Sequence, residues 1–150
     1  MSDFVLSVIP TDPRWQPDRE AGDRMAAMLR RLAPEADIFD VDWHERITVV
    51  DCGDNLERIT CPLCRGPIDP YWYGDLLEEH DAGRFDDLRV VVPCCGGQTS
   101  LDALDYDWAV GFARFEVAVW NALWEPLDAA TLESLGRTLG HPVRQILAHI

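Results

Sequence analysis

Two stretches of sequence, ITCPLCRGPIDPYWYG at residues 59–74 and VVVPCCGGQTS at residues 90–100, decide how this chain folds. Each contains a pair of cysteines, and the intervening segment from Arg65 to Pro93 separates the two pairs. The spacing in CPLC is that of a metal knuckle, in which the chain turns so that both thiolates face one ion and backbone N–H groups donate to the sulfurs. The two pairs therefore predict a metal site that joins segments distant in sequence.

The second pair is unusual because its cysteines are adjacent. Successive side chains of a strand point to opposite faces, whereas two ligands of one tetrahedral ion bring their sulfurs within about 4 Å of each other. Both bind only if the backbone bends, which Pro93, Gly96 and Gly97 favour. The expected ligands are Cys61, Cys64, Cys94 and Cys95; in the alternative set Cys52, His80 or His44 replaces one of the adjacent pair. For Cys52 a buried strand position is favoured, and for the histidines surface or capping roles.

The cysteine segment resembles the zinc-ribbon class through Cys61, Cys64 and the CCGG of residues 94–97. This resemblance implies a Zn²⁺ ion held by thiolates in a structural role. The segment departs from the family pattern in its adjacent second pair and in a gap longer than the roughly 15–20 residues of familiar sites. A helix expected at residues 70–82 accounts for the longer gap. The whole chain also resembles uncharacterised bacterial families of small proteins that join such knuckles to an α+β domain.

Outside the cysteine segment, the apolar pattern predicts two strand–helix–strand units. DFVLSVIP at residues 3–10 reads as a strand, and apolar residues from Ala21 to Leu32 recur at helical spacing after Pro17, a suitable first helical residue. DIFDVDWHERITVVDCG at residues 37–53 begins with alternating acidic and apolar residues, which predicts a strand with an acidic solvent face. The second unit is a strand in residues 112–121, a helix in residues 128–140 capped by Asp128, and a strand in residues 141–150.

The order of these elements predicts an α+β fold, a ferredoxin-like split βαβ sandwich. Residues 52–110 are then a zinc-binding hairpin inserted within a single domain that spans residues 1–150. The chain has 150 residues and is 47% hydrophobic, so it is long enough to bury one substantial core. Within the insert, RVVVP at residues 89–93 predicts a strand, and residues 99–108 predict a loop or a single helical turn capped by Thr99 or Ser100.

The charge of the chain argues against several classes of partner. The formal net charge is −14, from 27 acidic residues against 13 basic residues, all of them arginine. Affinity for nucleic acid rests on Lys and Arg that displace counterions from phosphates, so the sequence predicts no nucleic-acid partner and no anionic membrane. No apolar run is long enough to span a bilayer, the first residues do not have the pattern expected of a signal peptide, and five cysteines suit reduced thiols better than a disulfide framework. We expect a cytoplasmic protein, and the sequence predicts no oligomeric state.

The cysteine pattern does not favour a catalytic metal. An all-thiolate shell has no free position for a reactant, whereas hydrolytic zinc keeps one open. WHER before CPLC also departs from the nucleobase-deaminase signature, because Glu45 directly follows His44 and Thr60 precedes Cys61. A dithiol redox pair at CPLC is the second interpretation, but the RGPIDP after Cys64 does not continue a helix well.

Acidic and aromatic residues around the cysteine segment lead to the prediction of function. Asp102, Asp105 and Asp107 lack the order of a calcium-binding loop and predict a solvated acidic turn. Nearby aromatic side chains either pack the hairpin onto the sheet or form, with these acids, a surface for a basic protein. The predicted partner-binding residues are Trp72, Tyr73, Trp108, Asp105 and Asp107. We predict a non-catalytic, zinc-stabilised, acidic protein-binding module (an adaptor, inhibitor or immunity-type factor); the alternative is an enzyme that uses the cysteines for dithiol redox chemistry or zinc-dependent hydrolysis.

Overall fold

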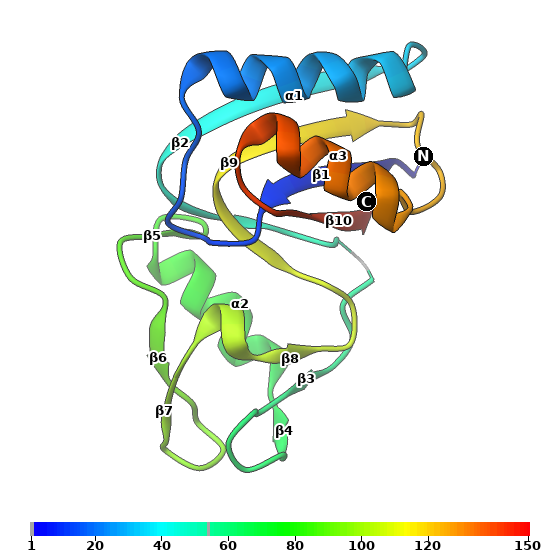
Figure 1. Cartoon of the computed structure of the whole chain (residues 1–150). Helices are drawn as coiled ribbons and strands as arrows, with labels where there is room; N and C mark the ends of the chain where they lie inside the picture. Colours follow the sequence, from blue (N-terminus) through cyan, green and yellow to red (C-terminus); the bar gives the residue numbers. More distant parts are fainter. Residues whose placement is uncertain (1, 54) are drawn as a thin grey trace.

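The computed structural model describes residues 2–53 and 55–150 and shows an α+β protein, which confirms the predicted class. A five-stranded antiparallel sheet in the order β10-β1-β9-β2-β5 forms one layer, and helices α1 and α3 cover one of its faces (Figure 1). The elements of these two layers are β1 (Phe4–Pro10), α1 (Arg19–Leu32), β2 (Ile38–Val50), β5 (Arg84–Phe85), β9 (Gly111–Trp120), α3 (Ala129–Leu139) and β10 (Val143–His149).

Helix α1 begins after Asp18, whose carboxylate accepts a hydrogen bond from the Ala21 N–H at 2.7 Å. The predicted start at Pro17 is therefore wrong, because the carboxylate of the next residue caps the helix better than proline begins it. Met25 and Leu29 are fully buried between the helix and the sheet, as the periodicity predicts. Leu32 is instead exposed, because it is the last residue of the helix.

Helix α3 has the two ends that its sequence predicts. The Asp128 carboxylate accepts a hydrogen bond from the Thr131 N–H at 2.8 Å, and Gly140 closes the helix in the left-handed conformation at φ 89°. Leu135 and Leu139 are buried against the sheet and α1. The two helices thus share one apolar core with the β1 and β9 side chains beneath them.

Strand β2 is long and carries an irregularity. Phe39, Val41 and Trp43 pack toward the helices, while Asp40 and Asp42 lie exposed on the opposite face, in line with the predicted alternation. The register with β9 shifts between Trp43 and Thr48, which marks an irregular stretch in β2.

Residues between β2 and β9, apart from β5, form a smaller part that lies below the main sheet in Figure 1. It contains a three-stranded sheet, a two-stranded hairpin and a second helix. Its elements are β3 (Ile59–Thr60), β4 (Pro67–Ile68), α2 (Pro70–Glu79), β6 (Arg89–Val91), β7 (Gln98–Ser100), the 3₁₀ helix η1 (Leu101–Ala103) and β8 (Asp105–Tyr106). Ser100 precedes η1, but its side chain makes no capping hydrogen bond, unlike the expectation. The boundaries of an insert at residues 52–110 stay a prediction.

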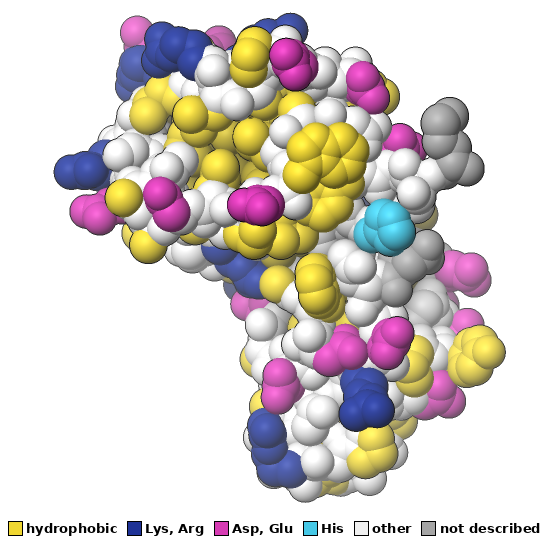
Figure 2. Space-filling model, turned by 90° about the vertical axis from the view of Figure 1, so that its right-hand side faces the viewer, with side chains coloured by type: hydrophobic (Ala, Val, Ile, Leu, Met, Phe, Trp, Pro, Cys, Tyr) yellow, Lys and Arg dark blue, Asp and Glu magenta, His cyan; other side chains and the backbone are white. Residues whose placement is uncertain are grey.

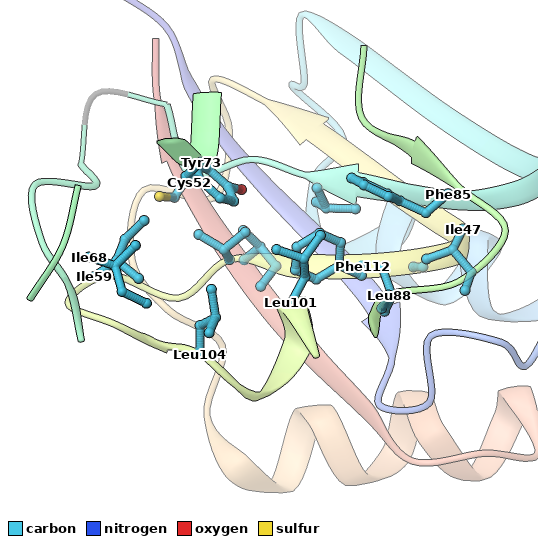
Figure 3. Packing of buried hydrophobic residues seen from close by; sticks show 14 of the residues in the cluster. Ile47, Cys52, Ile59, Ile68, Tyr73, Phe85, Leu88, Leu101, Leu104 and Phe112 are labelled. Atoms are coloured by element: carbon cyan, nitrogen blue, oxygen red, sulfur yellow. The ribbon is translucent and has the colours of Figure 1, made fainter. Parts of the chain in front are cut away.

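The smaller part has a core of its own, shown in Figure 3. This core extends onto the face of the main sheet opposite α1 and α3. Phe112 of β9 lies in this core together with Ile59 and Leu101 of the smaller part. Cys52 is fully buried there, and burial raises the pKa of its thiol to about 11. No helix in the described part of the chain is long and apolar enough to cross a membrane.

Candidate metal centre

The two cysteine pairs meet in space. The sulfurs of Cys61, Cys64, Cys94 and Cys95 all lie within 4.8 Å of one another, and the Cys64 and Cys94 sulfurs are 3.5 Å apart. Four thiolates around one tetrahedral ion, with metal–sulfur bonds near 2.3 Å, have sulfurs about 4 Å apart. The cluster is therefore consistent with a structural metal site, and the predicted four-cysteine grouping is confirmed as a possible metal site.

The first pair lies in the tight turn between β3 and β4. The Cys61 N–H donates to the Gly66 carbonyl at 2.9 Å, and the Arg65 N–H donates to the Cys61 carbonyl at 3.0 Å. Arg65 has a positive φ of 63°, which closes the turn. Two N–H groups also point at sulfurs, from Leu63 to Cys61 at 3.4 Å and from Gly66 to Cys64 at 3.3 Å.

The second pair lies in a turn of the same design between β6 and β7, which answers how adjacent cysteines face one ion. The Val92 N–H donates to the Gly97 carbonyl at 3.0 Å, and the Gly96 N–H donates to the Val92 carbonyl at 3.0 Å. Gly96 takes a positive φ of 71°, like Arg65 in the first turn. The turn VPCCGG is therefore equivalent to the turn CPLCRG. Val92 corresponds to Cys61, Cys94 corresponds to Leu63, and Cys95 corresponds to Cys64.

The four thiols influence one another's ionisation. Hydrogen bonds from the backbone N–H groups of Cys64 and Leu63 lower the pKa of Cys61 to about 7. Desolvation, followed by the hydrogen bonds and charges of Cys64 and Cys61, raises the pKa of Cys94 to about 12. The Gly97 N–H lowers the pKa of Cys95, but desolvation and the neighbouring thiols together outweigh it and raise that pKa. A divalent metal bound among the four sulfurs would offset the charge of their thiolates.

The three alternative ligands lie outside this cluster and have other partners. Cys52 is in the core, with its sulfur 3.9 Å from the Trp108 carbonyl. The His80 ring packs on Phe85 with centroids 5.0 Å apart, and its Nδ1 is 2.9 Å from the Leu76 carbonyl. His44 lies on β2, where its Nε2 is 2.8 Å from a Glu116 oxygen.

The residues predicted to bind a partner lie in different environments. Tyr73 is only 5% exposed and packs on Tyr106 in the core of the smaller part, so its ring is not on the surface. The sequence did not indicate this, because aromatic residues occur on more than one face of the short helix α2. Trp72 is partly buried against the same core. Trp108 is 41% exposed, but its Nε1 donates to the Leu147 carbonyl at 2.8 Å. The exposed Asp105 pairs with Arg65 at 3.4 Å, and Asp107 accepts from the Glu57 N–H at 3.1 Å.

A different apolar surface, which the sequence analysis missed, lies at the end of the main sheet where both termini meet. Figure 2 shows hydrophobic side chains gathered over the upper half of this face, with acidic side chains around them. The segments that end here carry four exposed hydrophobic residues, Leu32 (48% exposed), Ile38 (45%), Trp124 (62%) and Ile150 (54%). We call this set the apolar end. The register of antiparallel strands places the start of β2 beside the end of β9 (Ile38 opposite Trp120), while Trp124 stacks on Phe4 at the start of β1.

Carboxylates border the apolar end. The Asn121 amide donates to Asp3 and to Asp37, both at 2.9 Å, and so holds two acids at the ends of neighbouring strands. Glu35 and Glu125 are also exposed, next in sequence to these segments. The sequence signal for this surface is Trp124, because it is a large aromatic residue in the loop NALWEP at residues 121–126.

Comparisons of the chain with protein-family models, curated proteins and solved structures find no match. Interpretation of the site therefore rests on its own geometry. A set of four thiol ligands held by two rigid turns suits the binding of a metal ion in a structural role.

Proposed function

We propose that this chain is a non-catalytic, zinc-stabilised module that binds a basic protein partner. The observation that carries the proposal is the convergence of four cysteine sulfurs within 4.8 Å. Thiolates favour Zn²⁺, and four of them complete its tetrahedral shell, which leaves no position for a substrate or a water nucleophile. The ion then joins the β3–β4 and β6–β7 turns and stabilises the smaller part of the protein.

For the fold, we propose the ferredoxin-like split βαβ sandwich with a zinc hairpin inserted between its halves. The strand order β10-β1-β9-β2, antiparallel throughout, and the placement of α1 and α3 on one face support this assignment. In this view the sheet is the scaffold of the module. The zinc-bound part covers the region of its other face that contains Phe112 and Ile146.

The partner surface that the structure supports best is the apolar end, in place of the surface around Tyr73. Apolar side chains exposed in one region of a small protein mark interaction sites, and aromatic residues are enriched at the centres of interfaces. The carboxylates of Asp3, Asp37, Glu35 and Glu125 and the net charge of −14 select a partner with an apolar anchor and a basic rim. This charge disfavours nucleic acid and anionic membranes as partners.

We also propose a cytoplasmic location. Cys64, Cys94 and Cys95 are exposed, and their metal-binding form requires reduced thiols. Oxidising compartments convert close thiols to disulfides, whereas the cytosol keeps them reduced.

Metal analysis tests the structural site. The protein is purified without added zinc, and its metal content and reactive thiols are measured before and after chelation. We expect one zinc ion per chain, protection of the four clustered thiols, and their release on chelation. A protein that carries no metal and holds Cys64 and Cys94 in a disulfide would contradict the proposal and favour the redox alternative.

Two aromatic variants test the partner surface. Trp124→Ala removes the most exposed member of the apolar end, and Tyr71→Ala is a matched control because Tyr71 is 82% exposed on α2. We expect the wild type to capture a basic protein from its native extract, with salt-sensitive binding that Trp124→Ala loses and Tyr71→Ala retains. Capture that is unaffected by Trp124→Ala, or self-association of the wild type through this end, would refute this surface assignment.

A further inference from the structure

Three potential ligands meet at a second place, on the face of the main sheet opposite α1 and α3. Asp42 and His44 come from β2 and Glu116 from β9, and one ligand atom of each lies within 4.8 Å of the others. The intervening Trp43 and the neighbouring Phe115 point the other way, into the core beneath the helices. The cluster is distinct from the cysteine centre and plays no part in the proposed function.

The charges of this cluster call for a cation. Asp42 and Glu116 are directly opposite each other in the antiparallel ladder, and like charges in such positions destabilise a sheet. The ion pairs of the described residues bring no arginine to either carboxylate. Among those pairs His44 alone approaches the cluster's acids, with its Nε2 2.8 Å from a Glu116 oxygen.

The backbone holds the three side chains in place. His44 stands at the start of the irregular stretch of β2 between Trp43 and Thr48, and interruptions of this kind in a ladder re-aim side chains. The Gln16 amide bridges the two strands there, because it donates to the His44 carbonyl at 3.0 Å and to the Arg114 carbonyl at 2.8 Å. The strands are therefore tied together where the ladder is interrupted.

The geometry also suits direct coordination. The His44 and Glu116 side chains are only 22% and 16% exposed, so both are partly ordered by their surroundings. Two ligand atoms on a tetrahedral ion with bonds of about 2.0–2.2 Å lie about 3.4 Å apart. His44 Nε2 and the Glu116 oxygen, which are 2.8 Å apart in their hydrogen bond, therefore need to separate only slightly to bind an ion. Asp42 is the exposed third ligand and can adjust its carboxylate to the ion.

We propose that Asp42, His44 and Glu116 form a second, exchangeable site for a divalent transition metal. One imidazole with two carboxylates suits Zn²⁺, Co²⁺ or Mn²⁺ better than the all-oxygen preference of Mg²⁺ and Ca²⁺. Three protein ligands leave coordination positions to water or to a donor from another molecule, unlike the cysteine centre. The net charge of −14 raises the local concentration of cations around the site.

Calorimetric titration with Zn²⁺ and Co²⁺ tests this site in the intact protein whose cysteine centre is already filled with zinc. We expect one further equivalent, and cobalt bound there lacks the thiolate-to-cobalt charge-transfer absorption of a cysteine site. Asp42→Asn and Glu116→Gln should weaken this second equivalent at least about tenfold. Asp40→Asn is the matched control, since it removes the same charge from the same face of β2 outside the cluster, and it should bind as the wild type does.

Three results would overturn the proposal: no second equivalent in the wild type, binding by Glu116→Gln at wild-type affinity, or equal weakening by Asp40→Asn, which would show diffuse attraction in place of coordination. Circular dichroism verifies the fold of each variant. Glu116 is partly buried, so if Glu116→Gln does not fold, the variant of the exposed Asp42 decides the matter.

Discussion

Cys94 is the residue that distinguishes the two metal-binding turns. The turns share their backbone hydrogen bonds and a positive φ at the fifth position, but the first turn places its ligands at positions one and four and the second at positions three and four. Val92 occupies position one of the second turn and is fully buried, as Cys61 is in the first. The equivalence implies that a sulfur at residue 92 also reaches the ion.

The double variant Val92→Cys, Cys94→Leu tests this equivalence. It converts VPCCGG into CPLCGG, which matches the first turn at positions one to four. We expect the double variant to retain one zinc ion per chain, measured by metal analysis after dialysis against a weak chelator. Cys94→Leu alone leaves three thiols and should lose zinc under the same conditions. Loss of zinc from the double variant as complete as from the single one would show that the two turns are not equivalent.

The gathering of the four cysteines into one possible metal site was predictable, because CPLC has the local spacing of a metal knuckle. The role of Val92 was not predictable, since it depends on hydrogen bonds that pair residues five apart in a second turn. The pairing of Asp42 with Glu116 was hidden for another reason. Residues 74 positions apart become neighbours only through the register of β2 and β9.

Helix α1 approaches the sheet so closely that one helical position must be glycine. A Cβ at Gly22 lies 2.3 Å from a ring carbon of Trp43. Trp43 has little freedom to move, because its Nε1 donates to the Pro17 carbonyl at 3.2 Å and the Arg19 guanidinium lies 4.1 Å above its ring. This contact fixes α1 over β2.

Gly22→Ala should therefore destabilise the protein, by about 1–3 kcal/mol from overpacking, although alanine is ordinarily the better helix former. Gly74→Ala in α2 is the matched control, because a Cβ at Gly74 has no neighbour within 4 Å. That variant should stabilise helix α2 by roughly 0.5–1 kcal/mol. Urea unfolding measures the free energy of unfolding of both variants. If Gly22→Ala stabilised the protein, the Trp43 ring would have moved to make room for the Cβ.

The cap of α3 gives a pH-dependent contribution to stability. Hydrogen bonds from Thr131 lower the pKa of the Asp128 carboxyl below its ordinary value. A carboxyl whose pKa is lower in the folded state stabilises the fold above its unfolded pKa, and the stabilisation is lost as the pH falls through the folded pKa. The side-chain amide of an asparagine at this position would accept the same hydrogen bond without titrating.

Asp128→Asn should therefore be nearly as stable as the wild type at pH 7 and lose less stability than the wild type on acidification below about pH 4. Asp128→Ala should be less stable at both pH values, because no side chain accepts the Thr131 N–H. Thermal unfolding at pH 7 and pH 3 measures both effects. Equal acid sensitivity of the wild type and Asp128→Asn would show that other carboxyls determine the response.

Most of the regular elements were predictable from the sequence because their signals are local. The ends of α3 follow from Asp128 and Gly140, and the first half of β2 from its alternation of acidic and apolar residues. Strands of two residues, such as β3 and β8, carry no periodicity and exist only through pairing. The register shift in β2 was not predictable, because it appears only in the pairing of β2 with β9.

The whole molecule has two main cores, one on each face of the central sheet. The first joins α1, α3 and the sheet, and the second joins the smaller part with sheet residues such as Phe112. The second core consists largely of side chains from loops and very short strands, which have little stability of their own. If the proposed metal is bound, the order of the second core depends on it, whereas the first core contains long strands and two capped helices.

Removal of the metal should therefore unfold the smaller part and leave the main sheet folded. Structural zinc contributes on the order of 10–16 kcal/mol of apparent binding free energy at neutral pH, comparable with the stability of a whole domain. In Cys61→Ser, or in the wild type after chelation, we expect amide protection to fall across residues 59–106 and to persist in β1 and β9. Hydrogen exchange read residue by residue measures both regions.

Ala103→Ser, an exposed change in the same part of the chain, is the control and should keep the wild-type pattern. Unchanged protection at residues 59–106, or its simultaneous loss from β1 and β9, would contradict the dependence of one core alone on the cysteine centre.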